Sequence, residues 1–157
     1  MSYASIIPLI GGETIAMENV FGERPKYIMS YDGFEANDNH LVHHYNNEVP
    51  YLNLSEGHSY TEKVNVINTV CPCAGLSSLS PSAGSNNPMN EWMFTSAEYV
   101  LGEVQPKVFW GENAPRLASK MGEPVVKKLR KIGEKHGYSF SIYKTKKLIC
   151  LMTFYLE

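Results

Sequence analysis

Short apolar segments that suit β-strands alternate with segments of helical spacing along most of this chain of 157 residues. Strands are expected at residues 4–10, 26–31, 49–54, 64–70 and 106–110, and helices at 13–21, 35–45, 90–101 and 123–136. This alternation predicts an α/β fold with a mostly parallel sheet. Only residues 144–147 join the last two expected strands, at 138–143 and 148–155, so this C-terminal pair is predicted to be antiparallel.

The length and composition narrow the class of protein. A chain of 157 residues fits one domain with a sizeable core, and its formal charge of −2 does not suggest a strongly basic nucleic-acid binder. No apolar run approaches the ~20 residues that a membrane helix needs. Residues 1–5 lack the basic start of a signal peptide, so we expect a cytoplasmic protein without membrane partners.

The cysteines point to free thiols. The three are Cys71, Cys73 and Cys150, and their odd number and spacing favour neither a disulfide scaffold nor a metal site. Cys71 and Cys150 are expected to lie in the core. Cys73 follows Pro72 and leads into a polar, Ser-rich loop, which favours a reactive thiol at the end of a strand.

Three strand ends carry residues suited to chemistry. Gly11 and Gly12 form a turn before a helix, where a ligand can approach the backbone closely. Cys73 is a candidate nucleophile, and Glu112, followed by Asn113, is a candidate proton donor. If the three ends meet at one edge of the sheet, they form a plausible catalytic set.

Each feature also has a simpler interpretation. A Gly-Gly turn is more often an ordinary loop than a cofactor site. Glu112 can cap the short helical turn expected at residues 115–121. His40, His43 and His44 are expected on the solvated face of a helix, and no metal site is predicted there.

Three motifs together resemble the DNA cytosine-5 methyltransferase family. Pro-Cys-Ala-Gly-Leu-Ser at residues 72–77 resembles the family's Pro-Cys-Gln-Gly-Phe-Ser nucleophile loop. Glu-Asn-Ala at 112–114 resembles its Glu-Asn-Val motif, and Ile-Pro-Leu-Ile-Gly-Gly at 7–12 resembles its Phe-x-Gly-x-Gly-Gly turn. The order and spacing of the motifs agree over nearly the whole chain. The resemblance implies a Rossmann-like S-adenosylmethionine-dependent methyltransferase fold.

The resemblance also implies a site and a reaction. Cys73 would attack C6 of a cytosine flipped out of double-stranded DNA, Glu112 would protonate or hydrogen-bond its N3, and Asn113 would position the loop. C5 would then take the methyl group of S-adenosylmethionine. Asp32 and Glu35 compete for the role of binding the cofactor ribose. The implied cofactor-binding residues are Ile10, Gly11, Gly12, Asp32, Glu35, Asn53 and Pro72.

The chain also departs from the family pattern. Leu9 replaces the first glycine of the turn, Ala74 replaces the glutamine after the nucleophile, and Asn53 replaces a carboxylate. The Gln-x-Arg-x-Arg segment and the target-recognition domain have no counterpart, so residues 1–157 are expected to form a single catalytic-type domain. A second polypeptide would then supply the recognition part, as in a split restriction-modification enzyme. The alternatives are a non-catalytic methyltransferase-like protein that binds DNA or a restriction-modification partner, and an unrelated thiol enzyme.

Overall fold

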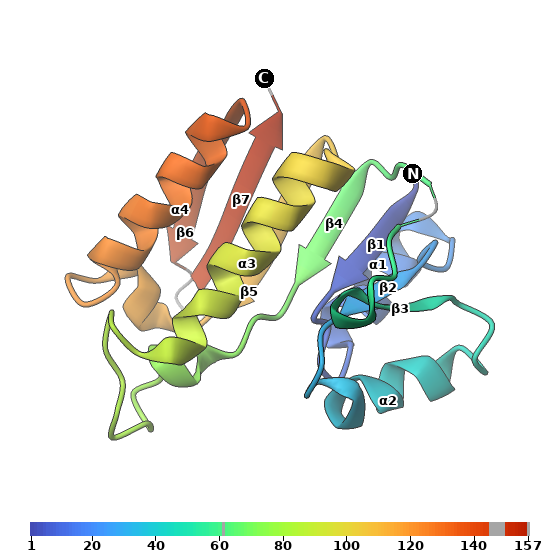
Figure 1. Cartoon of the computed structure of the whole chain (residues 1–157), viewed down its shortest axis with the longest axis horizontal. Coiled ribbons are helices and arrows are strands. Elements are labelled where there is room, and N and C mark those ends of the chain that lie inside the picture. Colours follow the sequence, from blue (N-terminus) through green and yellow to red (C-terminus); the bar gives the residue numbers. More distant parts are fainter. Residues whose placement is uncertain (61, 145–149, 157) are drawn as a thin grey trace. The chain divides into compact units, whose positions relative to one another are not determined.

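A computed structural model describes residues 1–60, 62–144 and 150–156 of the chain (Figure 1). The chain divides into two compact units, Met1–Val70 and Cys71–Glu157, hereafter unit 1 and unit 2. The division falls just before the Pro72–Cys73 segment. The two units are therefore described one after the other.

Unit 1 is built on four parallel strands in the order β3-β2-β1-β4. They are β1 (Tyr3–Ile6), β2 (Ile28–Ser30), β3 (Tyr51–Asn53) and β4 (Val66–Thr69). Helix α1 (Gly12–Phe21) connects β1 to β2, and α2 (Glu35–His44) connects β2 to β3. All residues of β1, β2 and β4 are buried, which is typical of parallel strands covered on both faces.

Apolar packing and buried hydrogen bonds hold the helices of unit 1 on its sheet. Ile28 of β2 packs with Leu41 and Tyr45 of α2 in one buried cluster. Ser5, Thr14 and Asn68 are fully buried and tie α1 to β1 and β4, because the Ser5 hydroxyl lies 2.6 Å from both the Thr14 Oγ1 and the Asn68 Oδ1. These bonds satisfy polar groups that would otherwise destabilise the core.

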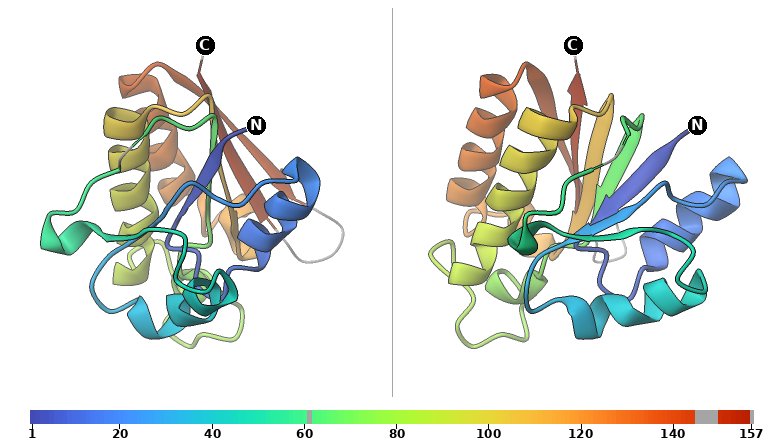
Figure 2. Two further views of the ribbon diagram at one scale, coloured as in Figure 1. Left: turned by 90° about the vertical axis from the view of Figure 1, so that its right-hand side faces the viewer. Right: turned by 45° about the vertical axis from the view of Figure 1, so that its right-hand side comes forward.

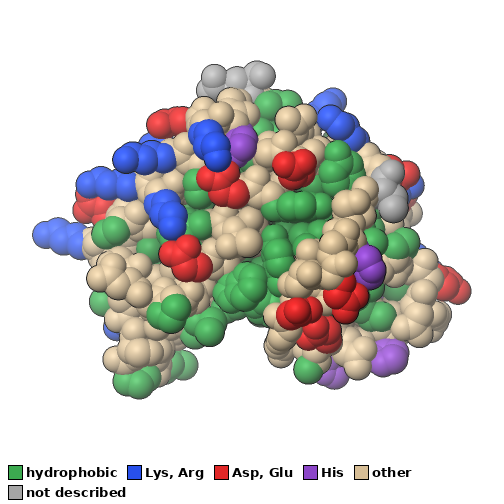
Figure 3. Space-filling view, in the orientation of Figure 1, with side chains coloured by type: hydrophobic (Ala, Val, Ile, Leu, Met, Phe, Trp, Pro, Cys, Tyr) green, Lys and Arg blue, Asp and Glu red, His purple; other side chains and the backbone are tan. Residues whose placement is uncertain are grey.

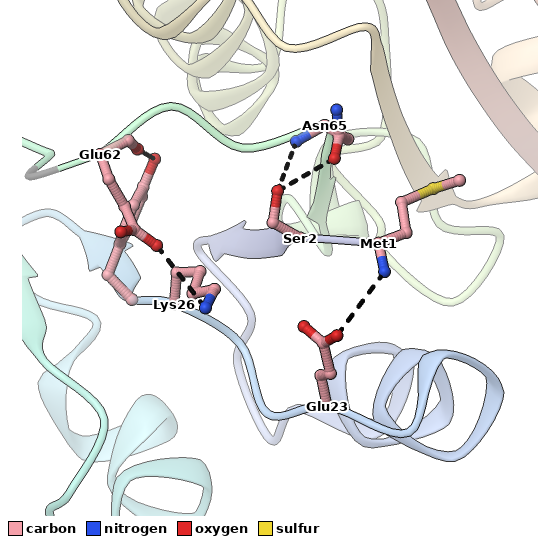
Figure 4. A network of polar contacts seen from close by, with 7 residues as sticks. Met1, Ser2, Glu23, Lys26, Glu62 and Asn65 are labelled. Atoms are coloured by element: carbon pink, nitrogen blue, oxygen red, sulfur yellow. Dashed lines mark hydrogen bonds and ion pairs between the residues drawn. The ribbon is translucent and has the colours of Figure 1, made fainter.

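Weaker polar contacts mark the amino end of this sheet (Figure 4). The Ser2 hydroxyl donates to Asn65 Oδ1 at 3.0 Å, while the ion pairs of Met1 with Glu23 and of Lys26 with Glu62 span 3.9 Å. Such exposed pairs contribute little stability. The carboxyl end of the strands carries the predicted cofactor residues.

Unit 2 contains three antiparallel strands in the order β5-β7-β6. They are β5 (Val108–Asn113), β6 (Tyr138–Lys144) and β7 (Cys150–Leu156), and helices α3 (Glu91–Tyr99) and α4 (Glu123–Lys135) lie side by side over one face (Figure 2). Phe154 of β7 stacks on Phe109 with ring centroids 5.6 Å apart and contacts Phe140 at 4.8 Å. Short turns occupy Cys73–Gly75, Pro88–Asn90 and Pro115–Ala118, and a π-helical turn at Val100–Val104 follows α3.

The predicted fold class is confirmed: in the described residues helices and strands alternate for most of the chain, with parallel strands in the first half and an antiparallel C-terminal pair. Two strand boundaries differ from the predicted ones by three residues or more. The first strand ends at Ile6 rather than residue 10, because Ile7 and Leu9 adopt positive φ angles of 47° and 53° that break the extended backbone. The strand expected at 106–110 runs on to Asn113, because β7 pairs with it as far as Cys150. The expected start of the last strand at Leu148 lies outside the described residues.

Candidate functional site

The turn after β1 has an unusual backbone. Ile7, Leu9 and Gly11 have φ angles of 47°, 53° and 81°, so every second residue is left-handed. Leu9 stands where the Phe-x-Gly-x-Gly-Gly motif has its first glycine. Its backbone has the left-handed conformation that glycine adopts most easily. A left-handed non-glycine residue costs roughly 1–2 kcal/mol. Ile10, at the tip of this turn, is 70% exposed.

The two glycines of the turn have different surroundings. A Cβ atom on Gly11 would overlap the side chain of Leu41, whose Cγ would be only 2.8 Å away. A Cβ atom on Gly12 would meet no atom within 4 Å, and Gly12 is the exposed first residue of α1. Gly11 is therefore required by the packing of α2, while Gly12 leaves open space at the start of a helix.

Two of the predicted cofactor residues meet beyond β2 and β3. The Asn53 side-chain amide donates to Asp32 Oδ1 at 2.8 Å, and Asn53 Oδ1 accepts from the Ser55 backbone N–H at 3.0 Å. The Asp32 N–H in turn donates to the Ser55 hydroxyl. Glu35 has a local role instead, because its carboxylate accepts the Gly33 N–H at 2.8 Å at the start of α2. Of the two competing carboxylates, Asp32 is the one joined to Asn53.

Asp38 of α2 is a buried carboxyl group that sequence reasoning missed. It has no exposed surface, and the Tyr51 hydroxyl donates to its Oδ2 at 2.7 Å. Burial raises the pKa of the Asp38 carboxyl, and the hydrogen bond from the Tyr51 hydroxyl opposes the rise. Asp38 lies three residues before Leu41 and seven before Tyr45, so helical spacing puts it on the same buried face. This spacing was the signal from which its burial could have been predicted.

In unit 2, Cys73 is exposed and opens a 3-10 turn directly after Pro72. Its carbonyl accepts the backbone N–H groups of Leu76 and Ser77 at 2.9 and 2.8 Å. Cys71 and Cys150 are free and buried, as predicted for packing residues. Cys73 is therefore the one thiol of the three that a solvent-borne substrate can reach.

Asn113 joins the Glu-Asn segment to the cysteine loop. It is fully buried at the end of β5, and its side-chain amide donates to the Cys71 carbonyl at 3.3 Å. Its Oδ1 accepts the Ala114 N–H at 2.8 Å. The structure thus brings together two segments that lie about forty residues apart in the sequence.

Glu112 precedes Asn113 on β5 and is half-buried. Its carboxylate lies close enough to Cys150 to add to the effect of burial, which raises the pKa of that thiol. The turn at Pro115–Ala118 begins after Ala114, whose side chain makes no capping hydrogen bond.

Two further residues shape the loop after Cys73. Asn90 is 2% exposed, donates to the carbonyls of Gly84 and Ser85 at 2.9 and 3.1 Å, and packs its Oδ1 against Gly75, where a Cβ would clash. The Arg116 guanidinium donates to the Ser77 carbonyl at 3.3 Å. Sequence reasoning missed both, because neither belongs to a motif. The position of Arg116, three residues after Asn113, was the only signal.

The other predictions about binding groups concern metals and membranes. His40, His43 and His44 are exposed on α2, as expected for a solvated face. Among the described residues, no group of three His, Cys, Asp or Glu side chains is placed to hold a metal ion. None of the helices in the described part of the chain has the length and apolar character needed to span a bilayer.

Comparison with known proteins identifies the fold. No protein-family model matches the chain, and no curated protein matches it in sequence. Solved structures of methyltransferases, however, match nearly its whole length. A putative DNA modification methyltransferase encoded within an Escherichia coli prophage is 15% identical with a TM-score of 0.69; the match covers 98% of this chain and 45% of that one.

Two other matching structures are those of a putative RNA methyltransferase and of a protein solved with SAH. A putative RNA methyltransferase from Pyrococcus horikoshii is 10% identical with a TM-score of 0.58, over 99% of this chain and 74% of that one. PigF, solved with SAH, is 12% identical with a TM-score of 0.59, over 98% of this chain and 50% of that one. The chain therefore has the Rossmann-like fold of methyltransferases. At these identities the similarity establishes the fold alone.

Proposed function

We propose that this chain is the catalytic part of an S-adenosylmethionine-dependent DNA cytosine-5 methyltransferase. The observation that carries the proposal is the hydrogen bond from Asn113 to the Cys71 carbonyl. It places the segment with the exposed Cys73 beside the strand end with Glu112. An exposed thiol and a half-buried carboxylate held on neighbouring segments suit covalent attack on an electron-poor ring.

The proposed reaction uses these two side chains in turn. The Cys73 thiolate forms a bond to C6 of the cytosine, while Glu112 donates a proton or hydrogen bond to N3 and takes up the charge that develops on the ring. S-adenosylmethionine, when bound, would supply an electrophilic methyl group to the electron-rich C5 and would leave as S-adenosylhomocysteine, whose sulfur keeps the electron pair of the broken S–CH3 bond. Loss of the C5 proton to a base then expels the Cys73 thiolate and restores the aromatic ring.

We assign cofactor binding to the turn after β1 and to the ends of β2 and β3. Gly12 fits this role because it leaves open space at a helix start. Asp32, already hydrogen-bonded to Asn53, is the better candidate than Glu35 for the ribose hydroxyls. Ile10 at the exposed tip completes the proposed set in unit 1, and the role of Pro72 in unit 2 stays a prediction from the sequence.

The charge distribution supports a nucleic-acid substrate for unit 2. Unit 2 contains eleven Lys and Arg against seven Asp and Glu residues, whereas unit 1 contains three against nine. The net charges are therefore +4 and −6, an asymmetry hidden in the overall charge of −2. Figure 3 shows Lys and Arg side chains gathered over α4. A positive surface attracts the phosphate backbone.

The first test is covalent trapping with duplex DNA that contains 5-fluorocytosine. In 5-fluorocytosine, fluorine stands at C5 in place of the proton that a base must remove to release the enzyme. The adduct between Cys73 and C6 therefore accumulates. We expect an adduct with the parent protein in the presence of S-adenosylmethionine, none with Cys73→Ala, and an undiminished yield with the control Cys71→Ala. Equal trapping by Cys73→Ala would refute the assignment of the nucleophile. RNA of the same sequence, offered in parallel, distinguishes the two nucleic acids.

A second candidate function is a methyltransferase-like protein that binds DNA or a restriction-modification partner without catalysis. Leu9 favours it, because a strained leucine stands where a glycine would leave more room for the cofactor. Calorimetric titration with S-adenosylmethionine separates the two functions. No heat of binding at millimolar cofactor, with the chain alone and with any second polypeptide that supplies target recognition, would leave only this candidate.

A further inference from the structure

The loop that carries Cys73 is held from the end of β5 at two points. Asn113 donates to the Cys71 carbonyl before the cysteine, and Arg116 donates to the Ser77 carbonyl after it, both at 3.3 Å. Ser77 itself lies one turn beyond Cys73, since its N–H donates to the Cys73 carbonyl at 2.8 Å. Arg116 is thus a cation attached directly to the turn with the proposed nucleophile.

Arg116 differs from the lysines of α4 in its hydrogen bonds. Lys127, Lys128 and Lys135 are exposed and each pairs with a glutamate, at 2.9, 3.3 and 2.8 Å. Within the described residues Arg116 has no carboxylate partner, and its guanidinium donates to a neutral carbonyl. A guanidinium has five N–H donors in a fixed fork, so most of its capacity to bind an anion is unused by this contact.

The proposed substrate brings an anion to this position. A cytosine in a DNA strand is flanked by a phosphate on each side, and these phosphates must approach Cys73 together with the base. A guanidinium binds a phosphate through two parallel hydrogen bonds, which are stronger than a bond to a neutral carbonyl. Arg116 is half-buried, which limits competition from water and favours such a bond.

We infer that Arg116 binds a backbone phosphate next to the reacting cytosine while it holds the Cys73 loop. The inference rests on the proposed function and adds to it a phosphate-binding residue outside the sequence motifs. Binding a phosphate at Arg116 would fix the strand relative to the loop, so the side chain would both position the nucleophile and register the DNA.

The test measures how DNA affinity depends on salt. Each phosphate neutralised by a side chain contributes about 0.9 to the slope of log K against log salt concentration. With a cytosine-containing duplex, we expect R116Q to lower the slope by about 0.9 relative to the parent, and R116K to retain it. The control K26Q, an exposed lysine of the acidic unit 1 that is paired with Glu62, should leave the slope unchanged. An R116Q slope equal to that of the parent would overturn the inference.

A second measurement uses the unaltered protein and so does not depend on a variant that folds. Phenylglyoxal modifies accessible arginines, and peptide mapping reports the rate at each one. We expect DNA to slow the modification of Arg116 but not that of Arg24, which is exposed in unit 1. Equal rates at Arg116 with and without DNA would contradict the inference. If the parent binds no DNA and forms no 5-fluorocytosine adduct, the proposed function itself fails.

Discussion

Adjacent glycines in the turn after β1 provide a sharp test of the structure. In Gly11→Ala, the left-handed backbone at φ 81° would cost roughly 1–2 kcal/mol. The new methyl group would also overlap Leu41, which is fully buried and cannot move into solvent. Overpacking of this kind costs about 1–3 kcal/mol, so we expect a total loss of about 2–5 kcal/mol in the free energy of unfolding.

The matched variant is Gly12→Ala. Its Cβ meets nothing within 4 Å and its φ is not left-handed, so alanine at this helix start should be neutral or stabilising by up to about 1 kcal/mol. Under the proposed function it should instead weaken S-adenosylmethionine binding, because the methyl group enters the space assigned to the cofactor. The two variants therefore separate a structural glycine from a ligand-binding one.

Urea unfolding followed by circular dichroism measures the first effect. With a slope of about 2 kcal/mol per molar urea, Gly11→Ala should lower the midpoint by about 1–2.5 M. Calorimetry measures the second effect on the folded Gly12→Ala protein. A Gly11→Ala midpoint equal to that of the parent would refute both the left-handed strain and the contact with Leu41.

Three further predictions concern one residue of unit 2 and two residues of unit 1. Asn113→Ala removes the donor to the Cys71 carbonyl, so it should lower the free energy of unfolding by about 1–3 kcal/mol and reduce the 5-fluorocytosine adduct yield; an unchanged yield would contradict its role in positioning the loop. Leu9→Gly should tighten S-adenosylmethionine binding, because it removes a side chain from a left-handed position without changing the backbone; weaker binding by calorimetry would contradict this. Burial raises the pKa of Asp38, so the folded state favours its protonated form, and the stability of the parent should fall as the pH rises through and above the ordinary range of a carboxyl group. Asp38→Asn should lack that fall, and parallel pH profiles of the urea midpoint would count against the assignment.

Much of the fold followed from local signals in the sequence. The helix expected at 35–45 appears as α2, because Leu41 and Tyr45 recur at helical spacing and pack against Ile28. The antiparallel C-terminal pair followed from the short connection between two strand-like segments. Strand ends were less predictable. Only pairing with β7 extends β5 through Glu112 and Asn113, and only the backbone angles of the turn end β1 at Ile6.

The candidate site divides in the same way. Motif residue types and spacing were enough to single out Cys73, Glu112, Asn113 and the glycine turn. The sequence could not show that Asn113 reaches the Cys71 carbonyl, because that bond depends on how segments about forty residues apart are folded together.

Neighbours that are distant in the sequence also distinguish the other residues of the proposed sites. Gly11 contacts Leu41 closely, Asp32 rather than Glu35 reaches Asn53, and Arg116 holds the loop after Cys73. Residue type and spacing set what each side chain can do, since those properties are local. Which of those capacities is used depends on neighbours that only the tertiary structure supplies.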